Sequence, residues 1–240
     1  MRMALKFAKG SSVKYISHLD LQRTFQRAFR RAELPIRYSQ GFNPHAKMSF
    51  ASALPVGVTS SDEYLDVELD DRISPVDVCN KLNQVLPQGL EVLGAKNLDK
   101  GFPSLMSIIN RAEYNLTYAG EDKDLAGGLQ ALNRFFEQGE IIATKRGKKG
   151  QREINIAPLI HRYSSQRNEG GILLNIMLSA GSKESLNPLL IVEALNNFLN
   201  VGNDGVWHIH RVGSLVDLEG KILDVFTVID IYKDLRGRTL

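Results

Sequence analysis

The chain has 240 residues, of which 43% are hydrophobic and 24% are charged, and its formal net charge is +3 at pH 7. This composition supplies enough apolar side chains to offset the entropy of ordering the chain, so it excludes wholesale disorder. No apolar run approaches the roughly 20 residues that a membrane-spanning helix needs. Cys79 is the single cysteine, and we find no secretory signal pattern, so we expect a cytoplasmic protein without a disulfide and with one or two domains.

The positive charge is concentrated near the start of the sequence. Residues 1–50 contain ten Lys and Arg residues and two acidic residues, a net charge of +8, so the other 190 residues carry a net charge of −5. Such asymmetry is typical of a protein that presents one face to a polyanion.

The first hundred residues predict a β-α-β-β-α-β order. Alternating Met3, Leu5 and Phe7 indicate a strand, and Ser17 followed by Asp20 indicates the capped start of a helix that ends before Pro35. Further elements are predicted as a strand at 47–54, a strand at 64–69, a helix at 75–86 and a strand at 90–98. This is the order of the ferredoxin-like split motif.

The helix that follows Ser17 has two chemically different faces. Its apolar residues recur at helical spacing, namely Leu21, Phe25, Ala28, Phe29 and Ala32. Its basic residues recur on the opposite side, namely Arg23, Arg27, Arg30 and Arg31. A solvated surface is the ordinary interpretation of such a face, but acids within helical reach occur only at Asp20 and Glu33. We therefore favour an anionic ligand.

The second half predicts a similar order of elements. These are strands at 113–118, 141–146, 172–179 and 207–215, helices at 122–138 and 187–199, and a final hairpin strand at 225–232. We predict an α+β fold of two tandem ferredoxin-like (βαββαβ) domains, residues 1–103 and 104–240, with a basic hairpin inserted in the second.

Basic and aromatic residues alternate at the start of the arginine helix and in the loop after it. Besides the four helix arginines, this set comprises Lys14, Tyr15, His18, Arg37, Tyr38, Phe42, His45 and Lys47. Cations pair with phosphates and aromatic rings stack on unpaired bases, so the combination predicts binding of single-stranded RNA. Packing of the loop onto the sheet is the alternative for Tyr38 and Phe42. Gly41 is expected to adopt a positive φ in a turn.

A second basic cluster lies between two apolar segments and predicts the tip of a β-hairpin. Its members are Lys145, Arg146, Lys148, Lys149 and Arg152. Such a tip can enter a nucleic-acid groove, and the alternative is a solubilising loop.

Catalytic signals are sparse. The five histidines show no metal-ligand spacing with carboxylates or with Cys79, and phosphate-binding glycine motifs are missing from the sequence. We therefore expect no metal site. His18 and His45, with Tyr38 nearby, are candidates for acid and base catalysis on a ribose 2′-hydroxyl.

Several segments closely resemble the radical SAM-linked family, a bacterial domain family of unknown function. They are Lys9-Gly10, Tyr15 to Leu21, Arg27 to Ala32, Leu34-Pro35, Tyr38 to His45, Ser49-Phe50 and Leu54-Pro55, with a second, weaker block at Lys145 to Pro158. The resemblance implies a partner in trans, because a radical SAM enzyme needs three cysteines for its cluster and this chain has one. S-adenosylmethionine and the iron–sulfur cluster are expected only on that partner.

Three functional hypotheses remain open. The first is an accessory protein that presents ribosomal or transfer RNA to a radical SAM enzyme. The second is a metal-independent endoribonuclease that uses His18 and His45, in line with a fold-level similarity to the CRISPR RNA-processing endoribonucleases. The third is an adaptor that docks the radical SAM protein and binds no RNA.

Overall fold

The computed structural model describes residues 1–119, 128–147, 150–168, 171–200 and 206–237 of a mixed α+β protein. The chain divides into two compact units: unit 1 comprises Met1–Asn110 and Gly213–Leu240, and unit 2 comprises Arg111–Val212. The boundary that we predicted at residue 103 left the whole C-terminal segment in the second domain. The structure instead groups this segment with unit 1, because its apolar residues cover one face of the unit 1 sheet.

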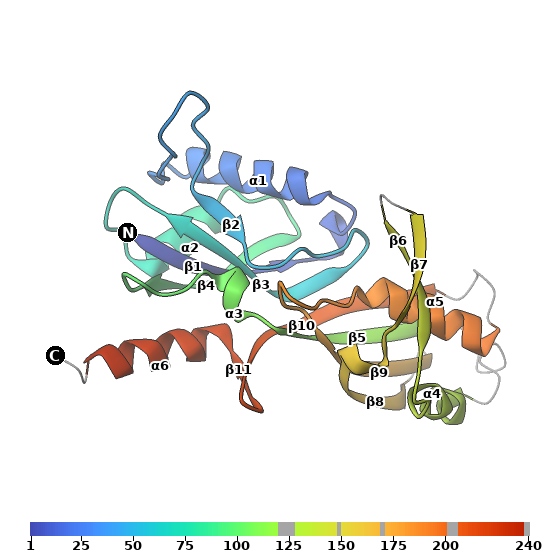
Figure 1. Ribbon diagram of the computed structural model, residues 1–240. Helices are drawn as coiled ribbons and strands as arrows, with labels where there is room; N and C mark the ends of the chain where they lie inside the picture. Colours follow the sequence, from blue (N-terminus) through green and yellow to red (C-terminus); the bar gives the residue numbers. More distant parts are fainter. Residues whose placement is uncertain (120–127, 148–149, 169–170, 201–205, 238–240) are drawn as a thin grey trace. The chain divides into compact units, whose positions relative to one another are not determined.

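The first part of unit 1 has the predicted β-α-β-β-α-β order (Figure 1). Its elements are β1 (Arg2–Lys9), α1 (His18–Arg31), β2 (Met48–Phe50), β3 (Thr59–Glu68), α2 (Pro75–Asn83) and β4 (Leu90–Leu98), followed by a short helix, α3 (Leu105–Ile108). β1 lies between β4 and β3, and β2 pairs with β3. All of these pairings are antiparallel.

Helix α1 confirms the predicted cap and the predicted apolar face. The Ser17 hydroxyl accepts a hydrogen bond from the Asp20 amide at 3.1 Å and donates one to the Asp20 carboxylate at 2.7 Å. Leu21, Phe25 and the rest of the apolar stripe are buried in a core that α2 shares. The chain leaves the helix before Pro35 because Glu33 takes a left-handed conformation with φ of 52°.

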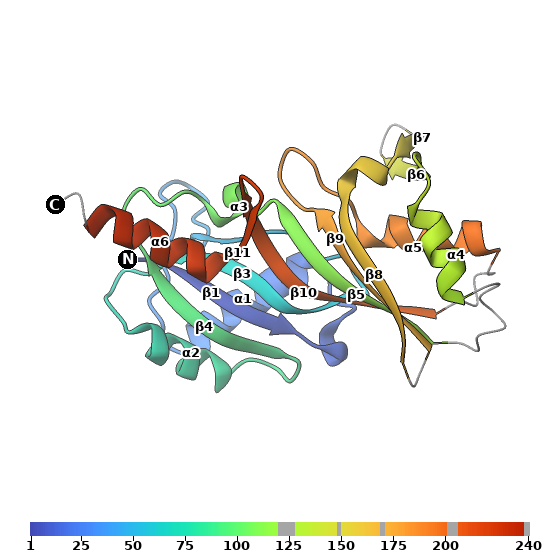
Figure 2. The ribbon, with the colours of Figure 1, turned by 90° about the horizontal axis from the view of Figure 1, so that it is seen from below.

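The prediction of a final strand at 225–232 is wrong. Strand β10 (Val206–Leu218) pairs with a short β11 (Lys221–Asp224), and the chain then forms helix α6 (Val225–Gly237). The alternation of branched and polar residues favoured a strand. The segment is helical because a helix brings Val225 and Ile229, four residues apart, onto one face, and both pack against Tyr64 and Leu98. Figure 2 shows α6 across the face of the unit 1 sheet opposite to α1.

The elements of unit 2 are β5 (Arg111–Ala119), α4 (Gly128–Phe136), β6 (Ile142–Gly147), β7 (Gly150–Asn155), β8 (Ile160–Asn168), β9 (Gly171–Ser179), α5 (Pro188–Leu199) and the first part of β10. In its described residues, unit 2 contains strands in the order β10-β5-β9-β8, with antiparallel β5–β9 and β9–β8 pairs, a separate hairpin and two α-helices. The predicted basic hairpin is confirmed as the β6–β7 pair. β8 is a strand that the sequence did not predict, and residues 122–127 of the predicted helix at 122–138 lie outside the described residues. A tandem of two ferredoxin-like domains stays a prediction.

A buried ionic network joins β1, β3 and the C-terminal segment within unit 1. The Asp62 side chain accepts a hydrogen bond from the Ser214 amide at 2.7 Å, and the Ser214 hydroxyl donates to the Asp62 carbonyl at 2.6 Å. The Lys6 ammonium forms an ion pair with Asp62 at 2.6 Å. Asp62 and Ser214 are both buried. Burial, reinforced by the Asp62 carboxylate, raises the pKa of Tyr64 far above its usual range, so that phenol stays neutral.

We expect the substitution Asp62→Ala to lower the free energy of unfolding by about 2–4 kcal/mol, because it leaves the Ser214 amide and the Lys6 ammonium without their acceptor. Urea denaturation followed by circular dichroism measures the change. Asp71→Ala, an exposed position on a nearby loop, is the control and should change stability by less than about 0.5 kcal/mol. A loss for Asp62→Ala no larger than that of the control would contradict the network's role.

Candidate nucleic-acid interface

The four arginines of α1 are all exposed, and they differ in how their charge is compensated. The Arg23 guanidinium lies 3.4 Å from the Asp20 carboxylate, as the sequence predicted. Arg31 donates to the Val85 carbonyl at 3.3 Å. Within the described part of the chain, neither Arg27 nor Arg30 forms an ion pair. These two guanidinium groups are therefore available to an external anion.

The loop after α1 exposes aromatic side chains. We call its residues 38–46 the Phe42 loop. Phe42 is fully exposed and Tyr38 is 44% exposed, so packing onto the sheet, the alternative interpretation, does not hold for Phe42. The loop is closed at its base, where Tyr38 bridges to Ala46 and the Ser39 amide donates to the His45 carbonyl at 2.9 Å. Gly41, at the tip, has the expected positive φ, 126°.

Arg37 and Lys47 differ from the helix arginines because acids of β3 and of the residues after it pair with them. The Arg37 Nε lies 2.8 Å from the Asp70 carboxylate and the Lys47 Nζ lies 3.2 Å from Glu68. Their partners are 21 to 33 residues away in sequence, so no local pattern indicated them. Both cations anchor the loop, and Arg37 lines an open pocket of about 710 Å³ together with Tyr38.

The segment before α1 contributes a further exposed aromatic group. Tyr15 is 71% exposed, and the Lys14 ammonium lies 5.0 Å from the centre of its ring. His18 is exposed at the first turn of α1, and its ring meets that of Phe50 edge-on with centroids 5.1 Å apart. Lys14, Tyr15 and His18 thus lie at the opposite end of α1 from the Phe42 loop.

A buried lysine beneath this segment escaped the sequence analysis. Lys9 is 2% exposed and its ammonium donates to the Lys14 carbonyl at 3.0 Å. Burial lowers the pKa of Lys9, and the neighbouring Glu63 carboxylate, 3% exposed, opposes that shift. A small pocket brings Lys9, Glu63 and His18 together, and His45 is not among its lining residues. The sequence could have predicted the burial of Lys9, since Lys9 continues the alternation of the inward-facing residues Met3, Leu5 and Phe7.

The basic hairpin belongs to unit 2. Lys145 and Arg152 are both exposed and lie directly opposite each other on β6 and β7, so two like charges face across the ladder. At the base, the Asn155 side-chain oxygen accepts from the amides of Ile141 and Ala157 at 3.0 and 3.1 Å. Lys148, Lys149 and the side chain of Arg146 lie outside the described residues.

Two structural criteria bear on other classes of function. Among the described residues, no group of three or more His, Cys, Asp or Glu side chains is arranged to hold a metal ion. No helix in the described ranges combines the length and apolar character needed to cross a membrane.

Residues 2–188 match the model of a family described as "Uncharacterized protein conserved in bacteria (DUF2344)". The chain belongs to this bacterial family. No curated protein matches the DUF2344 chain. Among solved structures, it is similar to one described as "Crystal Structure of a Cbf5-Nop10-Gar1 Complex", with 13% identity and a TM-score of 0.48. That similarity covers 99% of the DUF2344 chain and 56% of the other chain.

The hairpin of this DUF2344 protein provides a test of charge repulsion between its strands. We expect Lys145→Glu to stabilise the hairpin by about 0.2–1 kcal/mol, because an attractive cross-strand pair with Arg152 replaces a repulsive one. Amide hydrogen exchange at β6 and β7 should slow accordingly. Lys145→Gln, which only removes the repulsion, should give an intermediate rate. Unchanged or faster exchange in Lys145→Glu would contradict this account.

Proposed function

We propose that the protein is an RNA-binding accessory factor that presents RNA to a radical SAM enzyme. The observation that carries the proposal is that Arg27 and Arg30 on α1, which form no ion pair within the described ranges, occur together with a protruding loop that exposes Tyr38 and Phe42. The loop leaves directly from the C-terminal end of α1 (Figure 1).

The chemistry of this surface supports a single-stranded RNA ligand. A guanidinium without an internal partner pairs with phosphate and releases condensed counterions. An exposed ring on a closed loop offers a stacking surface to a base, at a cost in exposed apolar area that a protein otherwise avoids. The bases of double-stranded RNA stack on one another and leave no free face for Phe42. Its ring therefore favours unpaired bases, such as those in the loops and ends of ribosomal or transfer RNA.

The chemistry of modification is assigned to a partner. The chain has one cysteine, Cys79, and a radical SAM cluster requires three. S-adenosylmethionine and the iron–sulfur cluster therefore belong to the partner in this proposal. Its support is the sequence resemblance around α1 and the Phe42 loop.

Two other functions have specific tests. Metal-independent RNA cleavage by His18 has one supporting feature, since a buried lysine of lowered pKa is frequent in catalytic sites and His18 lies beside Lys9 and Glu63. The pocket that these three residues line has a volume of only about 10 Å³, so a nucleotide would have to bind outside it. His45 has a structural contact instead, as its Nδ1 lies 2.8 Å from the Ser39 hydroxyl. The adaptor function requires only the exposed basic face.

The RNA-binding function predicts a salt-dependent affinity that depends on α1. We expect Arg27→Gln/Arg30→Gln to weaken binding to a labelled single-stranded RNA and to reduce the slope of log K against log salt by about 1.4, because each lost phosphate contact contributes about 0.7. Fluorescence anisotropy at a series of salt concentrations, with EDTA present, measures both quantities. Phe42→Ala should weaken binding about fivefold or more without changing the slope, because it removes stacking but no charge.

The matched control is Lys81→Gln/Lys183→Gln, which removes two exposed charges from elsewhere on the chain. If the control weakened RNA binding as much as the arginine variant, the loss of affinity would be explained by net charge alone, and the proposed site would be overturned. Gel analysis of the same samples follows RNA integrity. Cleavage that persists in EDTA and disappears in His18→Ala would establish the nuclease function instead.

The partner part of the proposal predicts a complex with a radical SAM enzyme of the same bacterium. Size-exclusion chromatography of the two purified proteins should show co-elution, and RNA modification by the enzyme should increase when the wild-type chain is added. Arg27→Gln/Arg30→Gln should still co-elute but fail to stimulate. Co-elution without any RNA affinity of the wild-type chain would support the adaptor function. If the two proteins neither co-elute nor show stimulated modification, the proposal of a radical SAM partner is rejected.

A further inference from the structure

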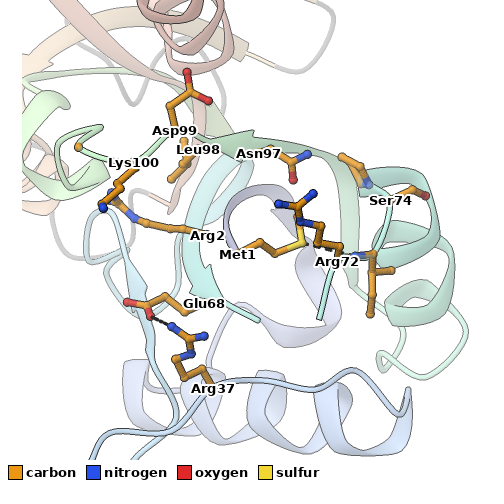
Figure 3. Close-up of a pocket in the computed structure, with 13 residues that line it drawn as sticks. Met1, Arg2, Arg37, Glu68, Arg72, Ser74, Asn97, Leu98, Asp99 and Lys100 are labelled. Carbon is orange, nitrogen blue, oxygen red and sulfur yellow. Dashed lines mark hydrogen bonds and ion pairs between the residues drawn. The ribbon is translucent and has the colours of Figure 1, made fainter. Parts of the chain in front are cut away.

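A pocket of about 740 Å³ lies in unit 1 between the ends of β1, β3 and β4 and the start of α2. This volume is within the range of about 300–1,000 Å³ that small-molecule sites occupy. The proposed RNA surface on α1 does not account for it. Figure 3 shows that cationic side chains approach the pocket from separate segments: Arg2 from β1, Arg37 from the loop, and Arg72 from the turn before α2.

The lining contains four cations and two acids. Its cations are Arg2, Arg37, Arg72 and Lys100, and its acids are Glu68 and Asp99. Two of the cations are already held by acids. Arg2 binds Asp66 with its Nε at 2.9 Å, and Arg37 binds Glu68 and Asp70.

The other two cations are not held in this way. In the described part of the chain, neither the Arg72 guanidinium nor the Lys100 ammonium forms an ion pair. Both residues are exposed at the rim. Figure 3 shows the Arg72 guanidinium pointing toward the side-chain amide of Asn97, so a charged donor and a neutral amide face the same space. An external anion would supply the acceptor that Arg72 lacks.

Part of the remaining lining is apolar. Ile73 and Pro75, both half-buried, contribute hydrocarbon surface beside the cations. An apolar wall, an amide with both a donor and an acceptor, and unpaired cations at the rim match the three parts of a nucleotide: base faces, base edge and phosphate.

We propose that this pocket binds a phosphorylated ribonucleoside, either a free mononucleotide or one unit of an RNA. The phosphate pairs with Arg72 and is attracted by the charge of Lys100 across the pocket, the base lies against Ile73 and Pro75, and the Asn97 amide meets the base edge. Inorganic phosphate lacks the apolar part and an acidic peptide lacks the planar base, so both are weaker ligands for this lining.

Isothermal titration calorimetry with the four nucleoside 5′-monophosphates tests the proposal on the full chain. We expect saturable binding of at least one, and a loss of about tenfold or more in Arg72→Ala, because a charge-assisted hydrogen bond to phosphate is removed. Lys100→Ala is a second variant that should weaken the same ligand. Lys81→Ala, an exposed lysine on α2 outside the lining, is the charge-matched control and should bind normally.

Each alternative ligand has its own decisive result. Binding of inorganic phosphate as tightly as of the mononucleotide would overturn the assignment, because the base would then contribute nothing. Binding of a poly-glutamate peptide without any mononucleotide binding would overturn it as well. So would mononucleotide affinity that Arg72→Ala and Lys100→Ala leave unchanged while both variants keep the wild-type urea midpoint.

A competition experiment separates the two nucleotide sources. Displacement of the mononucleotide by a short single-stranded RNA would assign the pocket to one unit of an RNA, and failure to displace it would assign a free nucleotide; either result supports the shared chemistry. The inference does not rest on RNA binding by α1. Arg27→Gln/Arg30→Gln should keep mononucleotide affinity, and Arg72→Ala should keep the Arg27- and Arg30-dependent salt slope, so the two proposals fail separately.

Discussion

Unit 1 depends on the burial of strand β3 on both faces. Leu65 and Val67 pack into the core beneath α1 and α2, while Tyr64 packs into the core beneath α6. A strand covered on both sides cannot use simple polar and apolar alternation, and its interior polar groups need internal partners. Asp62 finds them in Lys6 and Ser214, so the C-terminal segment is tied to the strand by hydrogen bonds as well as by apolar contact.

The same strand positions the candidate binding surface on the loop after α1. Glu68 lies at the end of the strand, and Asp70 follows it. Glu68 pairs with Arg37 and Lys47, and Asp70 pairs with Arg37, so both cations are held at the base of the Phe42 loop. Because these cations are fixed, the loop can be closed at its base by Tyr38 and Ala46 while its tip exposes Phe42. A ring held on a closed loop loses less conformational freedom on binding than one on an open chain, which favours a binding role.

Local patterns predicted the elements of unit 1 well, and non-local burial explains the errors. The cap at Ser17, the apolar stripe of α1 and the turn at Gly41 follow from interactions within a few residues, so the sequence showed them. The first part of β3 did not look like a strand, because Ser60, Asp62 and Glu63 are polar residues that only the folded protein buries. Helix α6 was mistaken for a strand for a related reason: its side chains suit either conformation, and the choice is made by the sheet face that it covers.

The candidate site shows the same division between local and distant information. Charge spacing identified the arginine face of α1, but the sequence predicted RNA binding by Arg37 and Lys47 in the same way as by Arg27 and Arg30. The structure separates the two pairs, because a cation already held by a carboxylate gives up that interaction before it can bind phosphate, whereas an uncompensated one does not. Arg37 lines both the loop pocket and the proposed nucleotide pocket while it is held by Asp70. Removing Arg37 would disturb the loop and both surfaces together. Arg27, Arg30 and Arg72, which form no ion pair with the residues that the structure describes, therefore distinguish the proposed functions where Arg37 cannot.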